Sequence, residues 1–325
     1  MTKYYYVTNG DGTTFEGFRP FANGDIAVAP DWVPDNRDCG YGLHVVPDDP
    51  TRALDYILRN CPRAFEVEPI DARPERDGKI RCRALRSIHE LSVEEFAVFF
   101  IARGADGASL AAESGHLACL QAVIAAGVLP TSDAANRAAG YGHIECFEAV
   151  IAAGVLPTFY GADWAAAYGH LACLQAVIAA GALPTDWGAN QAAENGHLAC
   201  LQAVIAAGAR PTDLGANLAA GYGHIECLEA VIAAGALPTP VGADLAAAYG
   251  HLECLQAVIA AGALPTSNGA NRAAENGHLA CLQAVIDAGV LPTPAGANQA
   301  AANGRPECAA LCREVLKKGR RVSTR

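Results

Sequence analysis

The sequence "AAENGHLACLQAVIAAGA" at residues 192–209 returns almost unchanged as "AAENGHLACLQAVIDAGV" at residues 273–290. Two looser copies lie between them, at 219–236 and 246–263, so the interval is three steps of 27 residues. Gly-His dipeptides keep the same step from Gly115 to Gly277, and Gly304 continues it with Arg305 in place of His. A chain that repeats in this way stacks its units into a solenoid, in which each unit buries its apolar faces against its neighbours.

One copy, residues 211–237, shows how the helices are encoded. Pro211 cannot continue a preceding helix, and the Thr212 hydroxyl can cap the helix that follows. Glycines at 221 and 223 turn the chain, and "HIECLEAVIAAG" then has apolar residues at helical spacing before Gly235 ends the second helix. Each unit is therefore predicted to be a hairpin of two short helices, and we expect about eight of them.

The repeated stretch resembles the "LAAxxGHLEVVxxLLxxGA" segment of ankyrin repeats. Ankyrin units are about 33 residues long, and the missing residues fall where that family carries a β-hairpin finger, between the second helix and the next first helix. The resemblance implies an all-α solenoid of ankyrin-like helical hairpins that lack these fingers. It also implies that binding uses the helix faces and short loops.

The His of the ankyrin "TPLH" motif is replaced by Asn or Asp in every copy. These residues are Asn136, Asp163, Asn190, Asn217, Asp244, Asn271 and Asn298. We expect their short side chains to join adjacent units by hydrogen bonds. The alternative is a ladder of ligand-binding groups.

Residues 1–90 differ in character and are predicted to form a small α+β domain. Strands are expected in "KYYYVT", "TTFEGF", "GDIAVA", "GLHVV", "AFEVEP" and "IRCRALRS", and a helix in "PTRALDYILRN". Ser92 and Glu95 form a capping box for a helix within residues 91–104, which we expect to cover the first repeat. Residues 105–325 are assigned to the repeat array, which ends in a basic cap.

The pattern "FEGF...CGYGLHVVPDDPTRALDYI...AFEVE" resembles an uncharacterised family of bacterial and phage N-terminal domains, which implies a bacterial or phage source. More distantly, "GLHVVPDDPTRALDY" is similar to the "GIYFxxxxxxSxxY" segment of ADP-ribosyltransferases. That resemblance implies an alternative function, an ADP-ribosyl-transferring or NAD-recognising N-terminal domain. Its candidate residues are Arg19, His44, Tyr56 and Glu66. A His in a strand is more often structural, so we favour a protein that is not an enzyme and has no cofactor.

Charge and composition narrow the choice of partners. Residues 101–304 contain four Arg and no Lys against 15 Asp and Glu, a net charge of −11, which argues against nucleic acid because phosphate binding requires basic side chains. No apolar run is long enough to span a bilayer, and the first residues lack the apolar core of a secretory signal. We therefore expect an acidic, cytoplasmic protein whose partner is another protein.

Cysteine and histidine recur at the repeat interval. Equivalent cysteines of stacked units lie too far apart for disulfides, so we expect reduced thiols. His116 and Cys119, and their equivalents, share a helix face as metal ligands could. A structural zinc needs four converging ligands, however, and one unit offers two, so no metal site is predicted.

The positions that vary between copies predict the partner-binding surface. They are the two residues after the repeat Thr and the residue after the Asn or Asp. The candidates are Arg137, Phe159, Tyr160, Trp164, Trp187, Gln191, Leu214 and Leu218. Exposed aromatic residues are common anchors of protein interfaces. The alternative is that Phe159, Trp164 and Trp187 fill gaps between neighbouring first helices.

Overall fold

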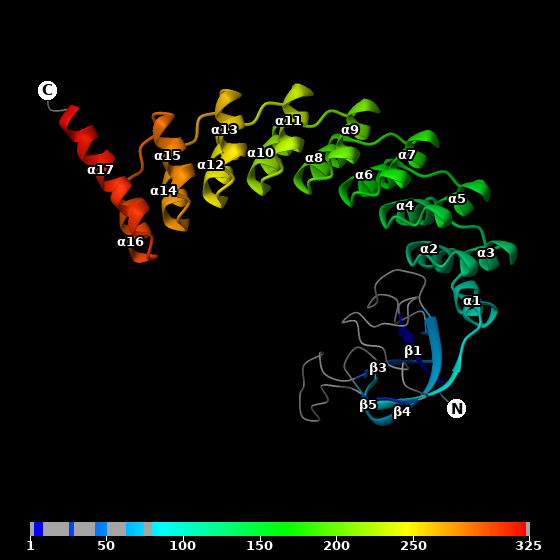
Figure 1. The fold of residues 1–325 in the computed structure, drawn as a ribbon. Coiled ribbons are helices and arrows are strands. Elements are labelled where there is room, and N and C mark those ends of the chain that lie inside the picture. The colour runs from blue at the N-terminus through cyan, green and yellow to red at the C-terminus, as the bar shows by residue number, and fades with distance from the viewer. Residues whose placement is uncertain (1–2, 9–25, 29–42, 51–62, 75–79, 323–325) are drawn as a thin grey trace. The chain divides into compact units, whose positions relative to one another are not determined.

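The structure is a computed structural model of the chain, and it describes residues 3–8, 26–28, 43–50, 63–74 and 80–322. The chain divides into two compact units, residues 1–161 and 162–325, and each is described by itself. A small sheet is followed by 17 helices among the described residues (Figure 1). The expected strand "TTFEGF", the expected helix "PTRALDYILRN", and the residues Arg19 and Tyr56 lie outside the described residues.

Five antiparallel strands form the sheet of the first unit. They are β1 Tyr4–Thr8, β2 Ile26–Val28, β3 Leu43–Pro47, β4 Arg63–Pro74 and β5 Ile80–Glu90. The order is β2-β5-β3-β1-β4, and a further pairing of β4 with β5 joins the two longest strands. The strands expected around 3–8, 24–29, 42–46, 64–69 and 80–87 are thus confirmed.

Alternating side chains of these strands build one core. Its buried residues are Tyr6, Ala27, Val45, Phe65, Val67, Cys82 and Leu85. Tyr6 faces Phe65 across β1 and β4, and Ala27 faces Leu85 across β2 and β5. Since the paired segments are far apart in sequence, this core depends on contacts that no local pattern encodes.

Helix α1, Val93–Ala102, joins the sheet to the first hairpin. Ser92 and Glu95 make the predicted capping box, in which the Ser92 hydroxyl accepts from the Glu95 N–H. Phe96 and Phe100 are buried, and the Phe96 ring meets the His116 ring edge-on with centroids 5.4 Å apart. Helix α1 packs against α2 and α3, the two helices of the first hairpin.

The remaining helices alternate between a first and a second helix of each hairpin. The first helices are α2 Ala105–Glu113, α4 Ser132–Gly140, α6 Phe159–Ala167, α8 Asp186–Glu194, α10 Asp213–Tyr222, α12 Pro240–Tyr249, α14 Ser267–Asn276 and α16 Pro294–Ala302. The second helices are α3 Leu117–Ala125, α5 Ile144–Ala152, α7 Leu171–Ala179, α9 Leu198–Ala206, α11 Ile225–Ala233, α13 Leu252–Ala260, α15 Leu279–Asp287 and α17 Pro306–Val322. No strand occurs within residues 93–322, so the connections between hairpins carry no β-hairpin finger.

In the second unit, helices α8 to α16 of even number lie side by side in one row, and the second helices form another row (Figure 1). Small residues let the first helices approach closely. In α10, Ala216, Ala219 and Ala220 are fully buried. The second helices α7 to α15 each contribute a buried Cys, Leu and Val, such as Cys227, Leu228 and Val231 of α11.

The Asn or Asp of each repeat joins it to the next, as predicted. The pairs within one unit are Asn136–Thr158, Asp163–Thr185, Asn190–Thr212, Asn217–Thr239, Asp244–Thr266 and Asn271–Thr293. In every pair the Thr N–H donates to the Oδ1 atom at 2.7–2.9 Å. The same Thr caps the next first helix, as Thr212 does by accepting from the Leu214 N–H. One side chain therefore positions the start of the following helix.

The turn glycines between first and second helices provide a second contact between repeats. Gly196 has φ of 74°, and a Cβ placed there would lie 2.6 Å from Nδ1 of His224 in the next repeat. Gly208 has φ of 99°, but a Cβ there would meet nothing within 4 Å. Both glycines therefore adopt a backbone conformation that disfavours other residues, but only Gly196 also lacks room for a side chain.

We expect Gly196→Ala to destabilise the chain more than Gly208→Ala. Both changes force a side chain into the left-handed region, at about 1–2 kcal/mol, whereas only Gly196→Ala also displaces a packed imidazole, at about 1–3 kcal/mol more. Urea unfolding followed by circular dichroism measures the difference. Equal midpoints for the two variants would show that the His224 contact has no role in stability.

Candidate functional site

Helices α10 and α12 each place three apolar side chains on one face at four-residue spacing. We call these six residues the central patch: Leu214, Leu218 and Tyr222 on α10, and Val241, Leu245 and Tyr249 on α12. Residues four apart are neighbours on a helix surface, so each set forms one stripe. Leu214, Tyr222, Val241 and Tyr249 are 52%, 57%, 58% and 57% exposed, and the two remaining leucines are half-buried.

The two stripes form one surface because α10 packs against α12. Leu245 leans across the gap toward Gly221 of α10, where an added Cβ would lie 3.1 Å from the Leu245 Cβ. A larger residue at 221 would push Leu245 away. The small residue at this point thus keeps the apolar surface continuous from one helix to the next.

The flanking first helices are more polar at the equivalent positions. On α8, Trp187 is 48% exposed and Gln191 donates to Glu194 at 2.6 Å. On α14, Asn268 and Arg272 are exposed. The central patch therefore has a polar boundary on α14 and an aromatic extension on α8.

The residue at the end of the first helix is Asn in some repeats and Tyr in others, and the two make different contacts. Asn195 donates to the Ala167 carbonyl at 2.9 Å, and Asn276 donates to the Ala248 carbonyl at 2.7 Å. These bonds tie each helix to the preceding one. Tyr222 and Tyr249 stand at the same positions and present exposed rings instead.

The structure places the sequence-predicted binding residues in different environments. In the second unit, Trp187 and Leu214 are exposed, and Trp164, Gln191 and Leu218 are half-buried. The exposure of Trp187 argues against its filling a gap between helices, whereas the partial burial of Trp164 agrees with that alternative. Trp187, Leu214 and Leu218 lie on adjacent helices, so the structure brings part of the set together.

In the first unit, Phe159 and Tyr160 are exposed at the start of α6, with ring centroids 4.1 Å apart. Arg137 is half-buried and pairs with Glu113 of α2 at 2.5 Å and with Asp133 at 2.7 Å. Its guanidinium thus joins two first helices, a role that the sequence prediction of partner binding did not anticipate.

Sequence reasoning did not group Tyr222, Val241, Leu245 and Tyr249 with Leu214 and Leu218 on one exposed surface, although it placed the two tyrosines at the rim of their repeats. The signal was present, since these residues follow Leu214 and Leu218 at the four-residue and repeat intervals. It was hidden because each residue is unremarkable alone. Only adjacency of α10 and α12 makes the six side chains one surface.

A second row of exposed leucines lies on the connections, just before the buried prolines. In the second unit these are Leu183, Leu237, Leu264 and Leu291. They belong to the repeated "LPT" segment, so they hardly vary between copies. This row is the natural comparison for the central patch.

Of the four residues of the enzymatic alternative, only Glu66 has a described side chain. Glu66 lies on β4, where its carboxylate pairs with Lys3 at 2.7 Å. His44 lies on β3 opposite Arg81 of β5, and only its backbone is described. With Arg19 and Tyr56 outside the described residues, the alternative stays a prediction.

The repeated histidines and cysteines have structural environments. His116 begins α3, where its Nδ1 accepts from the Cys119 N–H at 3.4 Å. No group of three or more His, Cys, Asp or Glu suited to a metal ion occurs among the residues that the structure describes. The ten described cysteines are buried and unbridged, in agreement with the expected reduced thiols.

Burial shifts the pKa values of the repeated cysteines and histidines. It raises the pKa of the Cys227 and Cys254 thiols to about 11, with a further contribution from nearby glutamates. Burial also lowers the pKa of His170 and His251, and the adjacent His197, His224 and His278 add to this because neighbouring imidazolium charges repel. The native state therefore favours neutral thiols and neutral imidazoles.

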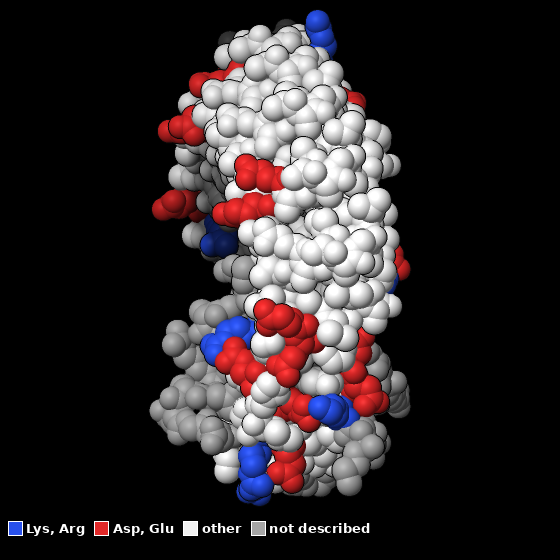
Figure 2. All heavy atoms as spheres, turned by 90° about the vertical axis from the view of Figure 1, so that its right-hand side faces the viewer, with Lys and Arg blue, Asp and Glu red and all other residues white. Residues whose placement is uncertain are grey.

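Acidic side chains are scattered among uncharged ones on the helical face drawn in Figure 2, and basic ones are few. Asp186 and Asp213 are exposed at the start of α8 and α10, where the helix dipole favours negative charge. Within the described chain, no helix is both long and apolar enough to cross a bilayer.

Comparison with models of protein families finds no match, and neither does comparison with curated proteins. Among solved structures, the human ASB11 ankyrin repeat domain is similar, with a TM-score of 0.41 and 20% sequence identity. The match covers 48% of this chain and 83% of that domain.

We expect the buried thiols to resist modification in the native state. In a chain carrying Cys39→Ser and Cys61→Ser, the remaining cysteines should react with Ellman's reagent at least about 100-fold more slowly than in urea, because both burial and a raised pKa suppress thiolate formation. Absorbance at the released thionitrobenzoate band gives the rates. Rapid native labelling would contradict the buried environment.

We also expect stability to fall as the pH is lowered from about 7.5 to 5.5. Because the folded-state pKa values of His170 and His251 are depressed, the unfolded state binds protons first. Their stabilising contribution is complete above the unfolded pKa of about 6.5 and is lost as the pH falls through the folded values. The urea unfolding midpoint should depend less steeply on pH in a variant with both His170→Gln and His251→Gln. An unchanged pH dependence would contradict the assignment.

Proposed function

We propose that the protein is a non-enzymatic protein-binding scaffold, which engages its partner through the variable first-helix face. The observation that carries the proposal is the central patch, an exposed apolar and aromatic surface on two adjacent helices. Exposed apolar patches of this kind on soluble proteins commonly mark interaction sites. Tyrosine is also enriched among residues that dominate binding energy.

Within a repeat, the residues that stack the hairpins differ from those that form the exposed patch, which supports this function. Residues that stack the hairpins, such as Asn217, Thr239 and Gly242, are bonded to one another across the repeat boundary. The central patch lies at positions that this bonding leaves available. Variation there changes the surface without disturbing the frame.

The surroundings of the patch indicate the chemistry of the partner. Asp186 lies at the start of the flanking helix α8, Asp213 lies at the start of α10 beside the patch, and residues 101–304 carry a net charge of −11. A partner with an apolar face bordered by basic residues would match both features. The resemblance of the N-terminal segment supports a bacterial or phage source, for which a host or defence factor would fit as the target.

A charge substitution tests the proposal. Leu214→Glu with Val241→Glu places two carboxylates in the central patch, while Leu237→Glu with Leu264→Glu makes the matched change at connector leucines of 58% and 51% exposure. We expect a partner identified by cross-linking and mass spectrometry to bind the first variant at least about 30-fold more weakly, because hot-spot losses reach about 2 kcal/mol or more. Isothermal titration calorimetry measures the affinities.

The control variant should bind as the unmodified chain does. Loss of binding in the control alone would assign the interface to the exposed leucines of the connections instead. Equal affinity of all three proteins would remove the first-helix face as the binding surface. Circular dichroism shows whether each variant keeps its helices.

A further inference from the structure

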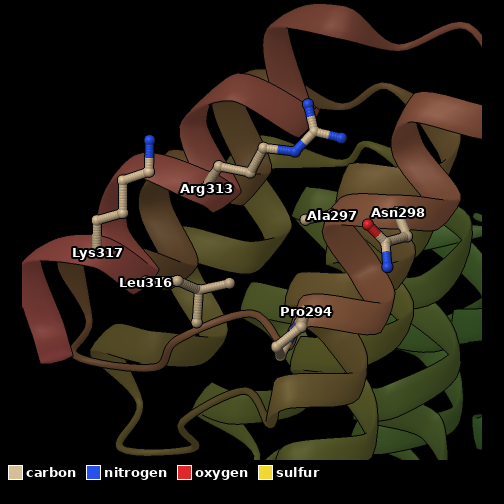
Figure 3. A pocket seen from close by; sticks show the side chains of 6 residues that line it. All are labelled: Pro294, Ala297, Asn298, Arg313, Leu316 and Lys317. Atoms are coloured by element: carbon tan, nitrogen blue, oxygen red, sulfur yellow. The ribbon is translucent and has the colours of Figure 1, made fainter.

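A groove at the C-terminal end of the second unit has its own chemistry. It lies between α16 and α17, encloses about 200 Å³, and is lined by Pro294, Ala297, Asn298, Arg313, Leu316 and Lys317. Figure 3 shows Arg313 reaching from α17 toward Ala297 and Asn298, and Leu316 pointing toward Pro294. Lys317 stands at the rim. The groove thus combines an apolar floor with an amide and two cations.

One wall of the groove is a stacking face that no hairpin of the described chain covers. In α10, α12 and α14, the residues Ala220, Ala247 and Ala274 are fully buried by stacking, whereas the equivalent Ala301 of α16 is exposed. Asn298 is likewise exposed, whereas Asn217 is 7% exposed. Helix α16 therefore exposes the surface on which each earlier repeat receives the next.

The earlier repeats show what such a face binds. Asn217 accepts from the Thr239 N–H at 2.9 Å and from the Gly242 N–H at 3.1 Å, and its Nδ2 donates to the Thr239 hydroxyl at 3.0 Å. The bound element is a helix start with the pattern Thr-x-x-Gly. Asn298 offers the same acceptor and donor to a segment of that kind.

Helix α17 makes the other wall basic. Compared with the repeat of α15, α17 has Arg313 in place of Ile286, Leu316 in place of Gly289 and Lys317 in place of Val290. Because the turn glycine is replaced, α17 continues where the second helices of earlier repeats end. Lys318 pairs with Glu314 at 2.6 Å. Arg313 and Lys317 have no carboxylate within 4 Å among the described residues. Their charge is available to an acidic ligand.

We propose that this groove binds an acidic helix-start segment of a partner protein, with the pattern Thr-Asp-x-Gly. The segment's Thr N–H donates to the Asn298 Oδ1, and its carboxylate pairs with Arg313, whose planar guanidinium suits a bidentate contact. Leu316 and Pro294 cover the apolar part of the segment. This site is separate from the central patch and does not depend on it.

A peptide from the chain itself supplies the probe. Residues 182–196, "ALPTDWGANQAAENG", contain the Thr185-Asp186-Trp187-Gly188 helix start of α8. Made with blocked ends and a neutral fluorophore, the peptide should bind the full chain saturably in fluorescence anisotropy. Raising the salt concentration should weaken the binding, because part of it is charge pairing.

Asn298→Ala and Arg313→Ala should each reduce the affinity at least about tenfold, since each removes a hydrogen-bonding partner, one of them charged. Thr185→Val with Asp186→Asn in the peptide should abolish the saturable signal. Gln299→Ala is the control, because Gln299 is exposed on the same helix and does not line the groove. That variant should bind the peptide unchanged.

Absence of saturable binding by the unmodified chain would overturn the proposal. Equal weakening by Gln299→Ala and Asn298→Ala would do so too. Sedimentation of the chain without peptide tests whether a second copy of the chain occupies the groove. Self-association that is lost in Asn298→Ala and Arg313→Ala would assign the groove to a second copy instead. Circular dichroism of each variant identifies any loss of fold.

Discussion

The hydrogen bonds between one repeat's Asn or Asp and the Thr of the next organise the helical part of this protein. A polar side chain at the tightest point of the stack would be costly if it lacked partners. Here each such group is satisfied by the backbone and hydroxyl of a helix start, so burying it specifies one position of the neighbouring hairpin. Slipping by one residue would leave both groups unsatisfied, and for that reason the stack has a single register.

Close approach makes these bonds possible. Gly215 lies where a Cβ would fall 2.6 Å from the Asn190 Oδ1, and alanines complete the contact surface between first helices. Small residues bury little apolar area each, but they let backbones and polar groups come within bonding distance. The larger Leu and Val of the second helices supply the remaining core. Stacking and hydrogen bonding therefore depend on the same small side chains.

A frame of this kind separates the side chains that stack from those that vary on the exposed face. The side chains that stack are largely identical from copy to copy, and those on the exposed side of the first helices differ. The central patch and the C-terminal groove illustrate two ways of using this freedom. In the patch, exposed apolar residues replace polar ones, and in the groove, the stacking face itself stays uncovered beside a basic helix. Both arise because each hairpin contacts only its neighbours.

The sequence by itself determined the 27-residue hairpin, the capping box at Ser92, the role of the Asn and Asp ladder, and the approximate strands of the N-terminal sheet. These follow from local periodicity and from residue chemistry repeated at one interval. Only the tertiary structure decided the order of the strands, the burial of Trp164 against the exposure of Trp187, and the pairing of Arg137 with Glu113. It also decided that Leu214, Leu218 and Tyr222 share a surface with Val241, Leu245 and Tyr249. Exposure and pairing depend on which segments become neighbours, and that is a property of the packed chain rather than of any stretch along it.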